Sequence, residues 1–469
     1  MNDTLLFSPV RSEPVEVPAS TSTLRQAQDK PGAVQNDAGD TGTALRFITC
    51  GSVDDGKSTL IGRLLVDSKT VLQDQLAGVQ RGGQTDLALL TDGLSAEREQ
   101  GITIDVAYRY FSTAKRKFII GDAPGHEQYT RNMVTAASAA DAAVVLVDAT
   151  KLAWASEVLD GEVVKQELLP QTRRHTLLCN LLRVQSIVFA VNKLDAMDDA
   201  DVAFDRISAA INGFAEVAGV SVAAIIPISA LEGWNVASQG TERADWCGYT
   251  GPSLLELLEQ LPVTAQDEAV PFAFPVQWVE KFSASADTSQ SRRVFWGRVA
   301  SGHVEPGQRV TVLPSNQTAI VAQVLSHTRQ PKAVHAGHSA GIVLDRELDV
   351  SRGDWLLAPE AFEPVREITA TVAWLDDEPL VAGRIYWALQ GHRWVKAKVT
   401  RIIDRVNITT LESEPTAQLE ANAIGDVVLA LQQPLAVLPF LQSRALGSLV
   451  LVDTATHKTS AAALVQPAS

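Results

Sequence analysis

The sequence predicts an α/β domain, built on a parallel sheet with helices on both faces, followed by two antiparallel β-barrel domains. Two changes of pattern along the 469 residues support this division. From residue 43 to about 262, short apolar runs alternate with amphipathic stretches of helical period, which is typical of buried parallel strands joined by helices. From residue 268 onward, short β-rich runs are separated by turn residues, which is typical of small barrels.

The same patterns set the domain boundaries. Residues 1–42 are rich in Pro, Ser, Thr, Asp and Gln without periodicity, so we expect a disordered leader. We expect the α/β domain over 43–262, the first barrel over 268–362 and the second barrel over 363–456. The remaining residues, 457–469, are predicted to form a loose tail.

Each predicted strand of the α/β domain is a short apolar run. These runs are Ala44–Cys50, Lys117–Ile120, Ala142–Val147, Ser186–Val191 and Ala224–Ile228. Runs that are apolar throughout are typical of a sheet covered on both faces. A helix is predicted over 59–66, after the first strand, and another over 254–261 at the end of the domain.

The barrel strands are predicted from runs of β-branched and aromatic residues. They are Phe274–Val279, Val294–Ala300 and Arg309–Leu313 in the first barrel, and Ile368–Trp374, Trp394–Thr400 and Gly447–Val452 in the second. Before the third of these strands, Pro306 and Gly307 predict a type II turn, because Pro presets φ and Gly accepts a positive φ.

Composition excludes several classes of protein. Hydrophobic residues make up 46% of the chain, which is enough to bury a core in each domain. No stretch approaches the ~18 uninterrupted apolar residues that a membrane span needs, and the first ten residues lack the basic region of a secretion signal. Cys50, Cys179 and Cys247 are too far apart in sequence to suggest a disulfide framework or a zinc site. We therefore expect a cytoplasmic protein that does not associate with membranes.

The charge balance bears on nucleic-acid binding. The formal net charge is −15, whereas nonspecific binding to nucleic acid depends on Lys and Arg neutralising phosphates. We expect no nucleic-acid partner, although a local basic face can exist within an acidic chain.

The first predicted strand leads into a phosphate-binding loop. Residues 51–58, GSVDDGKS, match the pattern G-x-x-x-x-G-K-[ST], and we call them the phosphate loop. Glycines allow backbone N–H groups to point at phosphates, Lys57 is expected to reach the β and γ oxygens, and the Ser58 hydroxyl is expected to ligate Mg²⁺. The predicted nucleotide contacts here are Gly51, Ser52, Val53, Asp54, Asp55, Gly56, Lys57, Ser58 and Thr59.

Three further loops favour GTP over ATP. The D-x-x-G at 122–125 offers a carboxylate for a Mg²⁺-bound water and an N–H for the γ-phosphate. The N-K-x-D at 192–195 offers a carboxylate that accepts from guanine N1–H and the exocyclic amine, a donor pair that adenine lacks. A backbone N–H in 229–231 can donate to guanine O6. The residues concerned are Asp122, Ala123, Pro124, Gly125, Asn192, Lys193, Leu194, Asp195, Ser229, Ala230 and Leu231. In this order, the four motifs predict a P-loop GTPase domain that binds GTP with Mg²⁺.

Two residues complete the predicted catalytic set with Lys57. Thr103 lies between the phosphate loop and Asp122, where its hydroxyl can complete the Mg²⁺ shell beside Ser58 and Asp122 and report whether γ-phosphate is present. His126 directly follows Gly125 and is placed to orient an attacking water. A single histidine is more often structural, but its place after D-x-x-G favours the role in hydrolysis.

These motifs resemble those of one family. The front domain resembles the translation-factor branch of GTPases, whose members carry a GTP-binding domain followed by two β-barrels. Within that branch, residues 53–65 (VDDGKSTLIGRLL), 92–111, 125–133 (GHEQYTRNM) and 171–175 (QTRRH) look like the GTPase subunits of bacterial sulfate adenylyltransferase. Elongation factor Tu and its relatives typically have His and Thr where this chain has Asp55 and Ser58.

The resemblance implies a function that the motifs alone do not. In that family a separate, smaller subunit carries the ATP and sulfate sites and makes adenosine 5′-phosphosulfate and diphosphate, while the GTPase subunit drives this uphill reaction. It therefore implies a heterodimer or larger complex. The alternative is a translation factor that delivers aminoacyl-tRNA, and the two functions differ in what binds to the barrels. Two trailing β domains disfavour a third function, a free-standing signalling GTPase.

Residues 151–170 depart from the family pattern and look like an insertion before Gln171. Their apolar residues recur at helical spacing, so we expect a helix there. It either packs on the partner subunit or on the barrels, or it decorates the surface.

Overall fold

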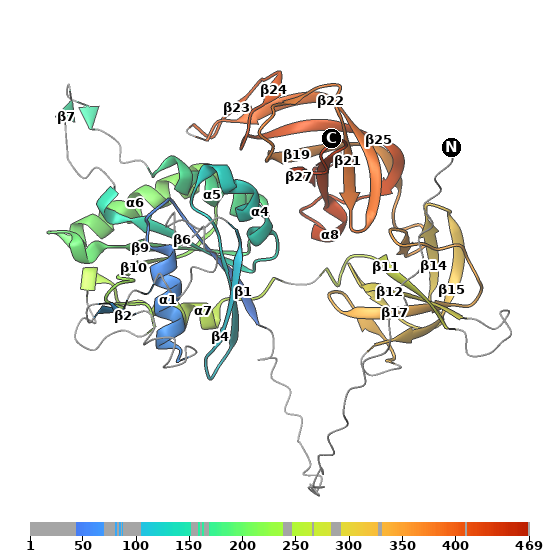
Figure 1. Cartoon of the computed structure of the whole chain (residues 1–469), viewed down its shortest axis with the longest axis horizontal. Helices are drawn as coiled ribbons and strands as arrows, with labels where there is room; N and C mark the ends of the chain where they lie inside the picture. Colours follow the sequence, from blue (N-terminus) through green and yellow to red (C-terminus); the bar gives the residue numbers. More distant parts are fainter. Residues whose placement is uncertain are drawn as a thin grey trace, which may run out of the picture. The chain divides into compact units, whose positions relative to one another are not determined.

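The computed structural model describes most of the chain (Figure 1). The described residues are 44–69, 80–81, 84–85, 87, 105–151, 158–159, 162–163, 168–237, 246–264, 267–282, 292–326, 331–408 and 410–467. The leader predicted over 1–42 and the predicted Mg²⁺ ligand Thr103 lie outside them.

The first domain is built on a six-stranded sheet with the strand order β10-β9-β6-β1-β5-β4. The strands are β1 (Leu45–Cys50), β4 (Ala107–Ser112), β5 (Lys117–Asp122), β6 (Ala142–Asp148), β9 (Ser186–Asn192) and β10 (Val222–Ile228). All neighbours run parallel except β4, which is antiparallel to β5 at the edge. The predicted parallel sheet is confirmed.

Helices cover both faces of this sheet. They are α1 (Lys57–Asp67), α4 (Thr130–Ser138), α5 (Pro170–Leu181), α6 (Ala200–Ala218) and α7 (Leu254–Gln260). Alternate strand residues enter two separate cores, since Val144 and Val188 pack with α1 and α7, whereas Val145 and Phe189 pack with α4, α5 and α6. This alternation explains why the strands are apolar throughout.

Short elements connect these parts. They are β2 (Gln80–Arg81), β3 (Gln84–Thr85), η2 (Glu127–Tyr129), η3 (Ala149–Lys151), η4 (Leu194–Ala196) and η5 (Trp246–Gly248). The predicted last helix of the domain is confirmed as α7. It begins with a capping box, in which the Ser253 hydroxyl accepts from the Glu256 N–H and the Glu256 carboxylate accepts from the Ser253 N–H.

The second domain is a closed barrel. Its strand order is β11-β12-β17-β15-β14-β18, and β18 pairs back with β11. These strands are β11 (Ala273–Phe282), β12 (Arg292–Arg298), β14 (Arg309–Leu313), β15 (Gln317–Leu325), β17 (Ser339–Leu344) and β18 (Trp355–Leu357), with the small pair β13 (His303–Val304) and β16 (Val334–His335) alongside. Gly307 has a φ of 91°, as the predicted type II turn requires.

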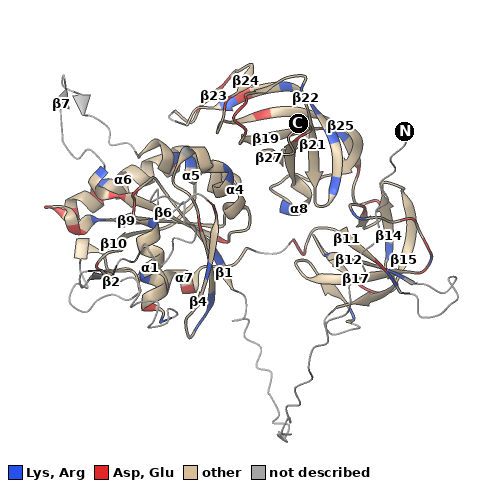
Figure 2. Ribbon diagram, viewed as in Figure 1, with Lys and Arg blue, Asp and Glu red and all other residues tan. Residues whose placement is uncertain are grey.

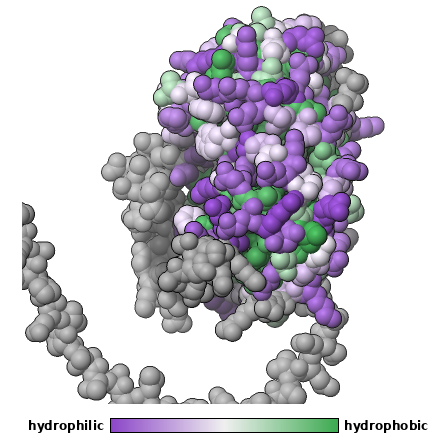
Figure 3. Space-filling model, turned by 90° about the vertical axis from the view of Figure 1, so that its right-hand side faces the viewer, coloured by the Kyte–Doolittle hydropathy of each residue, from purple (hydrophilic) through white to green (hydrophobic). Residues whose placement is uncertain are grey.

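The third domain is a second closed barrel. Strands β21, β26, β27, β19, β25 and β22 pair in this order, and β22 pairs back with β21. They span Ile385–Gln390, Ser448–Asp453, Thr459–Val465, Pro364–Trp374, Ile424–Ala436 and Arg393–Val406. The smaller elements are β20 (Leu380–Val381), β23 (Ser413–Glu414), β24 (Gln418–Leu419) and α8 (Arg444–Gly447). On the face seen in Figure 3, hydrophobic residues lie in small patches among hydrophilic ones.

The structure corrects two expectations. The tail predicted over 457–469 is wrong, because residues 459–465 form β27, which pairs with both β19 and β26. The helix expected within 151–170 is also wrong for residues 158–159 and 162–163, which form the short antiparallel pair β7 (Val158–Leu159) and β8 (Glu162–Val163). Among the described helices, none is both long enough and apolar enough to span a membrane.

Candidate nucleotide-binding site

The phosphate loop connects β1 to α1 at the carboxyl edge of the sheet. Gly51 and Gly56 have φ values of 143° and 92°, which L side chains rarely adopt. A Cβ at Gly51 would lie 2.7 Å from the Leu146 carbonyl oxygen, so only glycine fits there. Helix α1 begins at Lys57 with Gly56 as its N-cap and without a side-chain cap, which leaves the N-terminal N–H groups of the helix as donors for an anion.

Lys57 lies buried across the mouth of the phosphate loop. Its Nζ donates to the carbonyl oxygens of Ser52, at 2.6 Å, and Gly51, at 3.4 Å. Burial lowers the pKa of Lys57. A Cβ at Gly125, the glycine of D-x-x-G, would lie 2.5 Å from this Nζ. The structure therefore brings together two of the predicted phosphate-binding elements, and a side chain at position 125 would displace the Lys57 amine.

Side-chain acceptors, one on α5 and one within the loop, hold its first two N–H groups. The Gly51 N–H donates to Nδ1 of His175 on α5 at 3.1 Å, and the Ser52 N–H donates to the Asp55 carboxylate at 2.6 Å. The hydroxyl groups of Ser52 and Thr172, also on α5, lie 3.4 Å apart. The backbone at the start of the loop is thus fixed before any ligand arrives.

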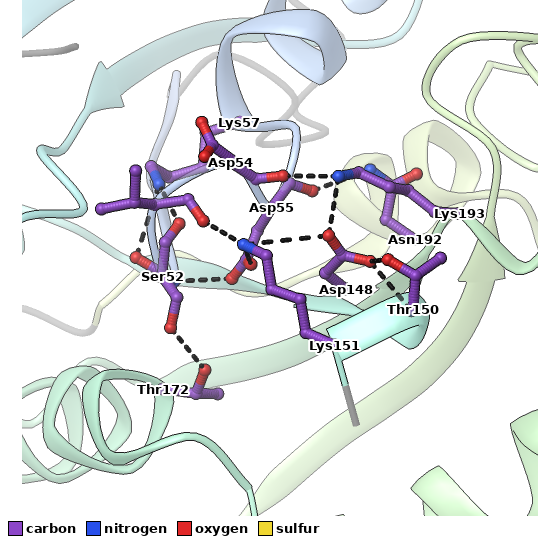
Figure 4. A network of polar contacts seen from close by, with 12 residues as sticks. Ser52, Asp54, Asp55, Lys57, Asp148, Thr150, Lys151, Thr172, Asn192 and Lys193 are labelled. Carbon is purple, nitrogen blue, oxygen red and sulfur yellow. Dashed lines mark hydrogen bonds and ion pairs between the residues drawn. The ribbon is translucent and has the colours of Figure 1, made fainter. Parts of the chain in front are cut away.

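Asp55 belongs to a network of ion pairs behind the loop (Figure 4). It is fully buried, and its carboxylate lies 3.0 Å from Lys151 Nζ, which also donates to the Val53 carbonyl. Burial raises the pKa of Asp55 and the contact with Lys151 partly offsets this. Asp148, at the end of β6, pairs with Lys193 at 2.6 Å and lies 3.8 Å from Lys151.

The predicted base-binding loops meet the phosphate loop directly. Asn192 donates through Nδ2 to the Asp55 carbonyl at 2.8 Å and accepts through Oδ1 from the Ala230 N–H at 3.0 Å. Lys193 donates to the Asp54 carbonyl at 2.6 Å. Asp195 is exposed in η4, as a carboxylate that binds a base must be. These contacts join the two motifs across 137 residues of sequence.

Two other residues of the predicted base-binding loops, Ser229 and Leu194, have structural roles. Ser229 Oγ accepts from the Glu232 N–H at 3.1 Å, which shapes the loop that carries Ala230 and Leu231. The Leu194 side chain is fully buried in the hydrophobic core, so any contact of this residue with a nucleotide is through its backbone.

The predicted Mg²⁺ ligands that are described are Ser58 and Asp122. Ser58 is in the first turn of α1, and Asp122 ends β5 beside Thr49, whose hydroxyl lies 3.4 Å from the Asp122 carboxylate. A hydroxyl and a carboxylate are the oxygen donors that Mg²⁺ prefers, so both residues fit the ion. Ala123 and Pro124 are buried, and His126 is half-buried with its ring 6.4 Å from that of Tyr129.

Sequence reasoning missed the residues that support the phosphate loop from outside. His175 is fully buried and belongs to none of the four motifs. Its place in the family-like segment 171–175 was the only signal for it. Lys151 was predicted only as the first residue of the insertion, and Asp148 belongs to none of the four motifs.

Comparisons with known proteins place the chain in a family. The model for the elongation factor Tu GTP binding domain matches residues 43–266, and the model for the GTP-eEF1A C-terminal domain-like family matches residues 367–466. A protein of Laribacter hongkongensis named sulfate adenylyltransferase subunit 1 is 42% identical over 90% of this chain and 85% of its own length. The chain belongs to the sulfate adenylyltransferase subunit 1 family.

Other relatives in the sulfate adenylyltransferase subunit 1 family agree. The protein of this name from Methylorubrum populi is 43% identical over 90% of this chain and 87% of its own length. The bifunctional enzyme CysN/CysC of Xylella fastidiosa is 44% identical over 88% of this chain, but only over 64% of its own length. The resemblance drawn from the front-domain motifs is confirmed.

Proposed function

We propose that the protein is the GTPase subunit of a sulfate adenylyltransferase. It hydrolyses GTP and couples this to formation of adenosine 5′-phosphosulfate and diphosphate from ATP and sulfate, which a smaller catalytic subunit carries out in the cytoplasm. One observation carries the proposal. Four loops that match guanine-nucleotide motifs meet at the carboxyl edge of the sheet, in a chain that is 42% identical over 90% of its length to a sulfate adenylyltransferase subunit 1.

The coupling has a chemical reason. When a sulfate oxygen attacks the α-phosphorus of ATP and diphosphate leaves, the new phosphosulfate anhydride is of higher energy than the bond that is broken. The reaction is therefore uphill unless a second, downhill reaction is linked to it. Hydrolysis of GTP on this chain supplies that reaction, and the link runs through loops whose order depends on the γ-phosphate.

The residues of the site take these roles. The N-terminal N–H groups of α1 and Lys57 bind the β and γ phosphates, and Gly125 offers its N–H to the γ-phosphate. Ser58, Asp122 and Thr103 hold Mg²⁺, which when bound neutralises charge that develops on the phosphate oxygens. Asp195 binds the N1–H and exocyclic amine of guanine, and a backbone N–H of the loop Ser229–Leu231 donates to guanine O6.

The decisive experiment measures diphosphate release from ATP and sulfate by the purified chain with its smaller partner, with and without GTP, together with GTP hydrolysis. We expect GTP-dependent stimulation in the complex and no adenylyl transfer by this chain alone. If no such partner binds, and the chain captures aminoacyl-tRNA in a GTP-dependent manner, the translation-factor alternative replaces the proposal.

Base recognition is tested by Asp195→Asn. The variant loses charged hydrogen bonds to guanine, so we expect affinity for GTP to fall about tenfold to hundredfold. Affinity for XTP should rise, because the 2-keto group of xanthine accepts from an amide. Asp198→Asn, which changes an exposed carboxylate three residues further on, is the control. Tight GTP binding by the Asp195 variant, measured by fluorescence of a labelled nucleotide, would contradict the assignment.

Water activation is tested by His126→Ala. Because His126 is proposed to orient the attacking water and not to bind the nucleotide, we expect unchanged affinity and hydrolysis slower by about a hundredfold or more. Single-turnover hydrolysis and equilibrium binding separate the two effects. Hydrolysis at the normal rate by this variant would exclude the role.

A further inference from the structure

Helix α5 contacts three consecutive residues where β1 enters the phosphate loop. Its three contacting residues are spaced by three and four positions, which places them on one face of the helix. The contacts are a 3.4 Å approach of the Thr172 and Ser52 hydroxyls and a 3.1 Å hydrogen bond from the Gly51 N–H to His175 Nδ1, and Cys179 lies beside Cys50 in the hydrophobic core. One face of α5 thus lies against Cys50, Gly51 and Ser52.

His175, the middle one of the three α5 residues, remains a hydrogen-bond acceptor because its ring stays neutral. The His175 ring is fully buried, and burial together with the nearby charge of Lys57 lowers its pKa to about 3. The imidazole is therefore neutral at physiological pH. Because Nδ1 accepts from the Gly51 N–H, the single ring proton is on Nε2, which lies 2.8 Å from the side-chain amide of Gln171.

The Gly51 N–H fixes the first peptide plane of the loop, which it shares with the Cys50 carbonyl, and the Ser52 N–H fixes the next plane, which holds the Gly51 carbonyl. With this N–H directed at α5 and the Ser52 N–H directed at Asp55, the carbonyls of Gly51 and Ser52 face Lys57 Nζ at 3.4 and 2.6 Å. Glycine at φ 143° has many alternative conformations, so a contact is needed to select this one. Within the described part of the chain, the side chain that accepts from the Gly51 N–H is His175.

We propose that His175 is a positioning residue for nucleotide binding, which holds the Gly51 peptide so that the phosphate loop has its binding conformation before the nucleotide arrives. The inference rests on the proposed function as far as nucleotide binding is concerned. It adds a residue outside the four motifs, on a helix that supplies no atom to the predicted contacts with phosphate or base. A loop without this contact must be ordered by the ligand, which reduces both affinity and association rate.

The test compares two variants of nearly the same size in the full chain. His175→Leu removes the acceptor, whereas His175→Asn keeps a side-chain oxygen that can replace Nδ1. Thr176→Val is the matched control, because Thr176 is equally buried on α5 and its hydroxyl donates to the Thr172 carbonyl within the helix. Fluorescently labelled GDP and GTP report equilibrium affinity and association rate, and melting without nucleotide reports stability.

We expect His175→Leu to bind about tenfold to hundredfold more weakly, with slower association, since a buried N–H loses its acceptor. His175→Asn should bind within about threefold of the unaltered chain, and Thr176→Val should bind normally. Normal binding by His175→Leu, or equal loss in the Leu and Asn variants, would overturn the proposal. Failure of the unaltered chain to bind guanine nucleotides would overturn the proposed function, and the positioning role with it.

A measurement on the unaltered chain covers the case in which His175→Leu does not fold. In ¹⁵N spectra of histidine-labelled protein, assigned with His175→Asn, we expect an unprotonated Nδ1 whose shift is constant from pH 5.5 to 8. A ring that titrates in this range, or that carries its proton on Nδ1, could not accept from Gly51 and would refute the positioning role.

Discussion

At the scale of single residues, the pairing of Asp55 with Lys151 has a consequence for stability. Lys151→Met leaves a buried carboxylate without its cation. We expect a loss of about 1–2 kcal/mol at pH 8, less than the 3–5 kcal/mol that is typical of fully buried pairs, because Lys151 is 31% exposed. The loss should appear as a lower unfolding temperature, and Lys151→Arg should retain most of the stability.

The sign of the pH dependence follows from Asp55. Burial raises its folded pKa above the ordinary value, and removal of Lys151 raises it further. An acid with a raised folded pKa stabilises the protein below its unfolded pKa, and this stability is lost as the pH rises through the folded pKa. The difference between variant and unaltered chain should therefore be small near pH 4 and largest at pH 8. A difference that does not change with pH would show that the charge of Asp55 is not its cause.

Single residues also show what the sequence could predict of the site. The roles of Gly51 and Lys57 follow from local pattern, because a phosphate loop needs positive φ and a cation at fixed offsets. His175 and Lys151 contact the same loop from 124 and 96 residues away. Their placement depends on how α5 and β6 pack beside β1, which no local pattern contains.

At the scale of elements, β27 shows how a strand escapes sequence analysis. Its residues, Thr-Ser-Ala-Ala-Ala-Leu-Val, are mostly small and lack the β-branched and aromatic character by which the other barrel strands were predicted. The strand is nevertheless internal to its barrel, with Ala461 and Ala463 fully buried. Similarly, β4 was not predicted, because it is an edge strand with exposed Tyr108 and Tyr110.

The position of β27 predicts the effect of truncation. Removal of residues 457–469 takes away the partner of both β19 and β26, opens the barrel and exposes its core, so we expect this variant to aggregate or to lose one thermal transition. Removal of 467–469 alone, which keeps β27, is the control. Calorimetry and gel filtration distinguish the outcomes. A soluble, fully cooperative variant without 457–469 would show that β27 is dispensable for the barrel.

At the scale of the whole molecule, the charges bear on the choice between an enzyme subunit and a translation factor. Figure 2 shows Lys and Arg interspersed with Asp and Glu over the first domain and both barrels. One strand differs, because β22 carries a row of exposed cations. These are Lys396, Lys398, Arg401 and Arg405. If any described strand binds RNA, this row is the strongest candidate by charge.

The row on β22 is too small to hold RNA at physiological salt. Four cations release about four counterions, so their contribution falls roughly a hundredfold between 50 and 200 mM salt, in a chain of net charge −15 that repels the remaining phosphates. We expect fluorescence anisotropy with labelled aminoacyl-tRNA and a GTP analogue to show no binding at 150 mM salt. Any weak binding at 20 mM should disappear in the double variant Lys396→Glu, Lys398→Glu. Nucleotide-dependent binding that survives 150 mM salt would require a dedicated RNA site, and would favour the translation factor over the sulfate-activating subunit.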